Sequence, residues 1–247
     1  MSILKMNKRE LSCVTFRNIK GFLTPDEVVH IAKTMGAFWA YDYEAADKGK
    51  VGMHAELKSG LHSDGFFVSR ILLEQENIRR IFSAQIAKEI GESCAIEEKP
   101  TCVVGVPDGA TTLGKDIGEQ YDINVLEMRK TTSGKIVLVS SLGPKEKVLL
   151  IEDFCTRGTG FIEAVLSIKK AQPKVCFVPY NPVIINRGGL KNILVPGVGD
   201  FKILSVVDWR VQDWDPKQGC PLCDRGSIPI KPKVSDANWK ALTTSQL

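Results

Sequence analysis

The sequence has no long apolar run, which limits where the protein can lie. No segment of the 247 residues approaches the ~20 apolar residues that a membrane-spanning helix needs. Residues 1–10 mix Lys and Arg with apolar residues and lack the unbroken apolar stretch of a signal peptide. We therefore expect a soluble protein that does not bind a membrane.

Runs of one charge are also absent. The 33 basic and 29 acidic residues give a net charge of +4 and are spread along the chain. Nucleic-acid binding is therefore not indicated, whereas a small anionic ligand is compatible with this mild balance.

A disulfide framework is the third missing feature. The seven cysteines are odd in number and are mostly single residues in apolar stretches, as at Cys102 and Cys176. This usage is typical of reduced core thiols and predicts a cytoplasmic protein. Cys220 and Cys223 form one CxxC pair, but no second CxxC or nearby Cys/His pair completes the four ligands of structural zinc. We interpret the pair as a structural turn or free thiols, with zinc shared between subunits and a redox role as alternatives.

The chain divides into three zones. Residues 1–53 form a mixed leader that we expect to supply N-terminal hood elements, including a helix over 25–35 capped by Thr24. Residues 54–210 hold the core. Residues 211–247 contain four prolines and little periodicity, so we expect an irregular C-terminal tail.

The middle zone alternates short β-rich runs with helical patterns, which predicts parallel strands joined by crossover helices. Continuous Val/Ile/Leu runs, as at 148–151, indicate strands covered on both faces. The predicted fold is α/β, with a central, mostly parallel sheet flanked by helices. We expect helices near 74–90, 109–121 and 159–170, and strands near 102–106, 123–127, 136–139, 148–151, 175–178 and 203–207.

The most informative segment follows the predicted strand 148–151. Glu152 and Asp153 end this strand, where open α/β sheets bind ligands, and the small turn 156–159 then opens a helix. Such a turn can direct backbone N–H groups at a phosphate, while carboxylates accept hydrogen bonds from hydroxyls. The combination suits a ribose 5-phosphate. The chain has neither the Gly-Lys-Ser/Thr ending of a P-loop nor the third glycine of a dinucleotide-binding turn.

This segment resembles the signature of type I phosphoribosyltransferases that binds 5-phosphoribosyl-1-diphosphate (PRPP). The resemblance implies the corresponding fold. It assigns the ribose hydroxyls to Glu152 and Asp153, and the 5-phosphate to the loop residues Thr156, Arg157, Gly158 and Thr159. By the same resemblance, the loop 105–110 binds the diphosphate through residues that include Asp108 and Gly109, although it lacks the lysine of some relatives.

Two further segments resemble orotate phosphoribosyltransferases. Residues 57–67 are similar to the base-binding segment, in which Lys58 would supply charge and Phe66 or Phe67 an aromatic face. His62 lies in this segment and is read either as part of it or as a solvated loop residue, while His54 is read as structural. Arg187, after an apolar run, resembles the arginine that pairs with the orotate carboxylate.

Residues 127–135 resemble the opening of the family's mobile catalytic loop. The loop would bring Arg129, Lys130 and Lys135 to the departing diphosphate, and Asp153 completes the catalytic set. The common bacterial loop continues with a second lysine and a histidine, whereas this chain has Thr-Ser-Gly before Lys135.

The resemblance implies transfer of the phosphoribosyl group of PRPP to orotate, giving orotidine monophosphate and diphosphate in pyrimidine biosynthesis. It also implies Mg²⁺ held mainly by PRPP without direct protein ligands, and a homodimer in which one subunit's loop reaches the other's site. Two alternatives are transfer to a different base, and a regulator that binds PRPP without turning it over.

Overall fold

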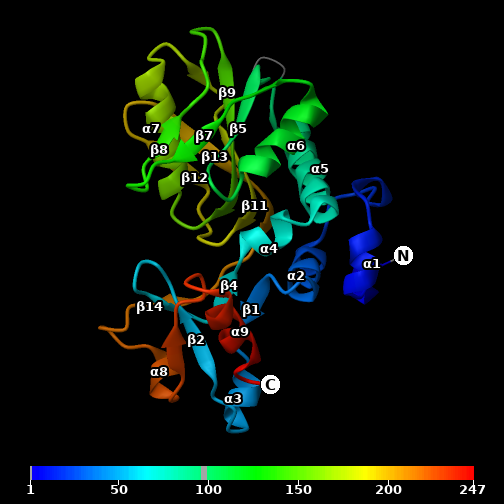
Figure 1. Ribbon diagram of the computed structural model, residues 1–247, viewed down its shortest axis with the longest axis vertical. Helices are drawn as coiled ribbons and strands as arrows, with labels where there is room; N and C mark the ends of the chain where they lie inside the picture. The colour runs from blue at the N-terminus through cyan, green and yellow to red at the C-terminus, as the bar shows by residue number, and fades with distance from the viewer. Residues whose placement is uncertain (1, 96–98) are drawn as a thin grey trace.

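The computed structural model describes residues 2–95 and 99–247. Figure 1 shows a larger upper part built around a twisted sheet and a smaller lower part to which both the early chain and the C-terminal segment contribute. Among the described residues, no helix has the length and apolar character needed to cross a membrane.

The central sheet is mostly parallel, as predicted. In spatial order it contains β12 (Asn192–Val195), β13 (Gly199–Asp208), β11 (Tyr180–Asn186), β9 (Lys147–Cys155), β5 (Cys102–Gly105) and β6 (Asn124–Val125). A seventh strand, β10 (Cys176–Phe177), pairs with the start of β9. Among the described strands of this sheet, only β12 and β13 pair in antiparallel fashion. This arrangement confirms the α/β fold class.

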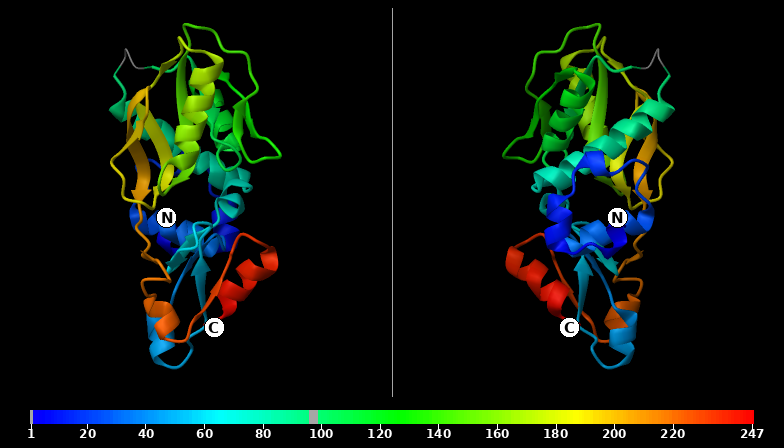
Figure 2. Two further views of the ribbon diagram at one scale, coloured as in Figure 1. Left: turned by 90° about the vertical axis from the view of Figure 1, so that its left-hand side faces the viewer. Right: turned by 90° about the vertical axis from the view of Figure 1, so that its right-hand side faces the viewer.

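Both faces of the sheet are covered, which explains the uninterrupted apolar run of β9. Leu149 and Ile151 face the core cluster that includes α5 (Glu76–Ser93) and α6 (Thr111–Tyr121). Val148 and Leu150 face the opposite cluster, which includes α7 (Thr159–Ala171). The hairpin of β7 (Met128–Lys130) and β8 (Ile136–Leu138) packs beside α7. Figure 2 shows the helices on the two sides of the sheet.

The leader packs against the lower end of the main core. It contains η1 (Ile3–Lys5), α1 (Lys8–Cys13), η2 (Phe16–Asn18) and α2 (Pro25–Thr34). The predicted helix is confirmed as α2, with Thr24 and Glu27 forming the capping box. The helix expected over 74–90 is preceded by a short separate helix, α4 (Ser69–Leu73), and α5 extends to Ser93.

The smaller part, here called the hood, joins residues from both ends of the chain. Its sheet has the order β14 (Asp213–Trp214), β3 (His62–Ser63), β2 (Met53–Glu56) and β15 (Ile228–Ile230). Beside it lie the antiparallel pair β1 (Phe38–Ala40) and β4 (Gly65–Phe67), and the helices α3 (Tyr43–Asp47), α8 (Pro221–Asp224) and α9 (Asp236–Thr244). One hydrophobic cluster contains Trp39, Phe66, Leu222 and Leu242.

The C-terminal tail is therefore not irregular, and that detail of the prediction is wrong. The segment 211–247 forms two strands and two helices, and the strands complete the hood sheet by pairing with β3 and β2. Strands of two and three residues are too short to display a period in the sequence, which is why composition alone suggested a loop.

Candidate active site

The candidate site lies where the sheet changes winding direction. The chain leaves β5 through α6 toward β6, but leaves β9 through α7 toward β11 on the other side. The loops at 106–110 and 156–158 therefore diverge at the carboxyl ends of adjacent strands. In open α/β sheets ligands bind at such a divergence, and we call this part of the molecule the crevice. The two loops are those predicted to hold diphosphate and phosphate.

Glu152 lies on the buried side of this crevice. Its side chain accepts a hydrogen bond from Asn181 Nδ2 at 3.4 Å and another from the backbone N–H of Phe161 in the first turn of α7. Burial, followed by the charge of Asp153, raises the pKa of Glu152 to about 8. Glu152 is therefore held in place by the protein and has little exposed surface for a ligand.

Asp153 is the more accessible carboxylate of the pair. It is partly exposed, and its side chain lies against the backbone of Gly109 in the loop after β5. A Cβ atom at Gly109 would overlap Asp153 Oδ2, so glycine permits this close approach of the two loops. The structure thus brings together two residues that the sequence assigned to different parts of one ligand.

The turn after β9 is shaped to receive an anion. Gly158 is the N-cap residue of α7 with φ of 67°, a conformation that glycine adopts at little cost. Gly158 has no side chain that could accept hydrogen bonds from the N–H groups of the first helical turn, so these groups are available to a ligand. The positive end of the helix dipole faces the same turn. The side chains of Arg157 and Thr159 are exposed beside it.

Arg187 follows β11 and reaches the turn after β9. Its Nη2 donates to Thr156 Oγ1 at 2.8 Å, and its guanidinium carbon lies 5.8 Å from the ring centroid of Phe154. Its Nε is buried and has no hydrogen-bond partner among the described residues. An unpaired buried donor is costly, so this geometry favours an additional acceptor supplied by a ligand.

The hairpin of β7 and β8 places one of the three predicted loop cations at the crevice. Lys130 Nζ lies 3.3 Å from Asp108 Oδ2. Arg129 is its neighbour on the strand and projects to the opposite face of the hairpin. Lys135 is exposed at the far end of the turn, which is closed by hydrogen bonds from Thr131 N to Lys135 O at 2.8 Å and from Lys135 N to Thr131 Oγ1 at 3.1 Å.

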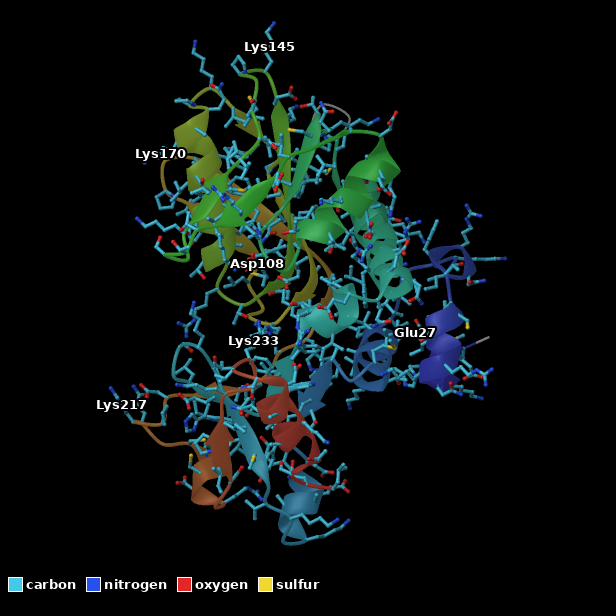
Figure 3. The ribbon with its side chains drawn as sticks, viewed as in Figure 1. Glu27, Asp108, Lys145, Lys170, Lys217 and Lys233 are labelled. Atoms are coloured by element: carbon cyan, nitrogen blue, oxygen red, sulfur yellow. The ribbon has the colours of Figure 1, made fainter. Side chains whose placement is uncertain are left out.

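The sequence did not identify Lys233, which reaches the same crevice from the hood. Its ammonium lies 5.9 Å from the ring centroid of Phe66. Lys233 is exposed to solvent. The protein around its ammonium partly desolvates it and lowers its pKa, and the positive charges of Arg187, Lys130 and Lys58 lower the pKa further, while Asp153 opposes them. Figure 3 shows Lys233 on the hood, below Asp108 on the larger part of the molecule. No motif surrounds Lys233, so the sequence held no signal for it.

The two predicted aromatic residues have different environments. Phe66 belongs to the hood cluster, near Lys233. Phe67 is fully buried in the main core, with its ring centroid 4.2 Å from that of Phe38 and 5.5 Å from that of Phe154. The expectation that Phe67 could present a face to a ligand is therefore wrong, because successive residues of a strand point to opposite sides.

The CxxC pair also has neighbours that the sequence did not indicate. His54 and His62 lie beside Cys220 and Cys223, and the ligand atoms of all four residues are within 4.8 Å of one another. The expectation that no Cys/His pair accompanies the CxxC pair is therefore wrong, because the two histidines come from a distant part of the sequence.

Comparison with known proteins agrees with this geometry. No family model matches the chain. An orotate phosphoribosyltransferase of Acidithiobacillus ferrooxidans is 29% identical over 213 residues, covering 85% of this chain and 97% of the relative. One from Nitratiruptor is 27% identical over 189 residues, covering 72% and 90%. The chain is thus similar to orotate phosphoribosyltransferases over most of its length.

Two solved structures share the fold of this chain. The crystal structure of orotate phosphoribosyltransferase from Aeropyrum pernix superposes with a TM-score of 0.56 at 16% identity, over 73% of this chain and 93% of that one. Leishmania donovani UMP synthase gives a TM-score of 0.51 at 18% identity, over 81% of this chain and 40% of that one. The type I phosphoribosyltransferase fold is thus shown independently of the sequence motifs.

Proposed function

We propose that this phosphoribosyltransferase transfers the phosphoribosyl group of PRPP to orotate, giving orotidine monophosphate and diphosphate in pyrimidine biosynthesis. One observation carries the proposal. At the crevice between β5 and β9, the accessible carboxylate of Asp153 lies among the cationic side chains of Lys58, Lys130, Arg187 and Lys233. Such a cluster suits two anionic reactants, one of which has a diol for the carboxylate.

The placement of PRPP follows from the two loops. Its 5-phosphate would accept hydrogen bonds from the backbone N–H groups of the turn 156–159, at the positive end of α7. Its ribose hydroxyls would donate to Asp153, with Glu152 fixing the strand end behind it. Its diphosphate would lie over the loop at 106–110, where Asp108 positions Lys130.

The base would occupy the side of the crevice that faces the hood. Orotate is a planar anion, and the unpartnered Nε of Arg187 can donate to its carboxylate. Lys58, on the turn between β2 and β3, and Lys233 would contribute charge from the hood. Phe66 is only 6% exposed, so it would offer no more than a small apolar surface near Lys233.

The protein would do little covalent work in this reaction. The bond from the anomeric carbon to diphosphate breaks as the bond from that carbon to the base nitrogen forms, and positive charge develops on the ribose. Lys130 would stabilise the departing diphosphate, and closure of hood on sheet would exclude water that hydrolyses PRPP.

Mg²⁺ is proposed to arrive mainly on PRPP and to neutralise part of the diphosphate charge. The exposed carboxylate of Asp108 and the partly exposed Asp153 are hard oxygen donors on the two loops, and they fit second contacts to such an ion. We further propose a homodimer. Arg129 lies on the opposite face of the hairpin from Lys130, and Lys135 is exposed at its turn, so both would be available to a partner subunit's site.

The decisive experiment measures diphosphate release from PRPP and Mg²⁺ with orotate, with no base, and with a panel of purines and nicotinamide. We expect orotate-dependent release and formation of orotidine monophosphate. Product from another base and none from orotate would reject the proposed acceptor.

A second comparison separates an enzyme from a PRPP-binding regulator. Asp153→Asn should lose PRPP binding, whereas Lys130→Ala combined with Lys135→Ala should retain binding and lose turnover. A wild-type protein that binds PRPP but releases no diphosphate with any base would favour the regulator.

A further inference from the structure

Four metal-binding side chains from two distant segments converge inside the hood. His54 lies on β2 and His62 on β3, while Cys220 precedes α8 and Cys223 lies within it. Their ligand atoms all lie within 4.8 Å of one another. We propose that His54, His62, Cys220 and Cys223 bind one structural Zn²⁺ ion that fastens the C-terminal segment to the β2–β3 hairpin.

Four of the six distances between the ligand atoms are close to those of a tetrahedral centre. Zn–S bonds of about 2.3 Å and Zn–N bonds of about 2.0–2.1 Å place tetrahedral ligand atoms roughly 3.3–3.8 Å apart. Cys223 Sγ lies 3.3 Å from His62 Nδ1 and 3.6 Å from His54 Nε2. Cys220 Sγ lies 3.9 Å from His54 Nε2, and the two imidazole nitrogens are 3.0 Å apart. No separation exceeds 4.8 Å, so a side-chain movement of up to about 1 Å would centre an ion among them.

A hydrogen bond to Ser227 orients His54 for this role. Ser227 Oγ donates to the carbonyl oxygen of Gly52 at 3.3 Å, so its lone pairs are available to His54 Nδ1 at 2.9 Å. With its proton on Nδ1, the imidazole presents the Nε2 lone pair to the centre of the cluster. Metal-binding histidines characteristically donate their second N–H in this way.

Burial and chemistry favour a closed structural zinc site. His54 is fully buried, and Cys220 and His62 are 2% and 6% exposed. Two thiolates and two imidazoles in a tetrahedral arrangement are typical of Zn²⁺, and all four positions are filled by protein. Both cysteines are free thiols in the structure, as metal binding requires.

The site would connect the two segments that bring charge to the crevice. His54 and His62 flank the turn that carries Lys58, and the chain from Cys223 continues through β15 to Lys233. The short pairings of β15 with β2 and of β14 with β3 lie on either side of the cluster. This consequence rests on the proposed function, whereas metal binding itself does not.

The test measures zinc content by mass spectrometry in untagged, folded protein. We expect about one ion per chain in the wild type. Cys13→Ser and Cys176→Ser alter exposed cysteines outside the cluster, so these variants should retain the zinc ion. Cys223→Ser and His62→Asn should lose it, and the remaining fold is followed by circular dichroism.

A second measurement covers variants that fail to fold. Cobalt added to metal-depleted wild-type protein should give the absorption bands of tetrahedral Co²⁺ with thiolate charge transfer. The proposal would be overturned if wild-type protein contained no zinc and gave no cobalt bands. It would also be overturned if the peptide that contains Cys220 and Cys223 were two hydrogens lighter than expected, because this mass indicates a disulfide. If zinc binds but its removal leaves the KM for orotate unchanged, only the link to the crevice fails.

Discussion

Lys130 Nζ lies 3.3 Å from Asp108 Oδ2, so the β7–β8 hairpin is held at the loop that should receive the diphosphate of PRPP. Lys130→Ala removes this charge at the leaving group and should lower kcat by about 10²–10³-fold, the usual cost of one transition-state donor. Lys130→Arg should recover part of the loss. Steady-state diphosphate release measures both variants.

The matched control is Lys145→Ala, because Figure 3 places Lys145 at the far end of the molecule from the crevice. Its activity should equal that of the wild type. Equal kcat for Lys130→Ala and Lys145→Ala would remove Lys130 from the reaction.

Lys233 gives a prediction about the base. Lys233→Ala should raise the KM for orotate by about 10-fold, since a hydrogen bond to a charged group contributes about 1.5–3 kcal/mol. The lowered pKa of Lys233 adds a pH effect, because its charge is lost at a lower pH than that of an ordinary lysine. The KM of the wild type should therefore rise at alkaline pH more than that of the variant.

Lys217 is a suitable control on the same C-terminal segment, because Figure 3 places it on the outer side of the hood. Lys217→Ala should leave the KM for orotate unchanged. A similar KM in both lysine variants would show that Lys233 does not contact the base.

The sequence predicted the parts of the site that are local along the chain. The order of Glu152, Asp153 and the glycine turn is continuous from β9 into α7, and the α2 capping box needs only Thr24 and Glu27. Such features depend on residues that are close together in the sequence, so their pattern can be recognised before the fold is known.

The hood could not be predicted in the same way. Lys233 and the Cys220–Cys223 pair reach their neighbours only because β15 pairs with β2 and β14 pairs with β3, across more than 140 residues of chain. Likewise, both Phe66 and Phe67 suit an aromatic wall in sequence. The pairing of β4 with β1 decides which ring enters the core.

Gly109 gives a test of loop geometry. In Gly109→Ala the new Cβ would overlap Asp153 Oδ2, and the flexible carboxylate should turn away from the crevice. Affinity for PRPP should fall by at least about 10-fold, equivalent to one lost hydrogen bond involving a charged group. Isothermal titration calorimetry with PRPP and Mg²⁺ measures the loss.

Gly91→Ala is the control, because a Cβ at Gly91 on α5 would meet no atom within 4 Å. Equal affinities of these two variants would contradict the proposed role of Asp153.

Glu152 gives a prediction about stability and pH in the absence of ligand. Its pKa is raised to about 8, mainly by burial, against an unfolded value of about 4.3. Between these values the folded state binds more protons than the unfolded state, so this carboxyl makes the protein less stable as pH rises. Glu152→Gln keeps the shape and cannot ionise. Its melting temperature relative to the wild type should therefore increase from about pH 5 to about pH 8, with about 2–4 °C for each kcal/mol.

The comparison isolates Glu152 because all other titrating groups are shared by the two proteins. Glu119→Gln, which alters an exposed carboxyl on α6, should differ from the wild type by a nearly constant amount over the same range. Thermal unfolding followed by circular dichroism gives the three curves. A difference between Glu152→Gln and wild type that stays flat, or that shrinks as pH rises, would mean that Glu152 is ionised throughout. Asn181 and the Phe161 N–H would then stabilise a carboxylate, and both acidic residues would face PRPP as charged groups.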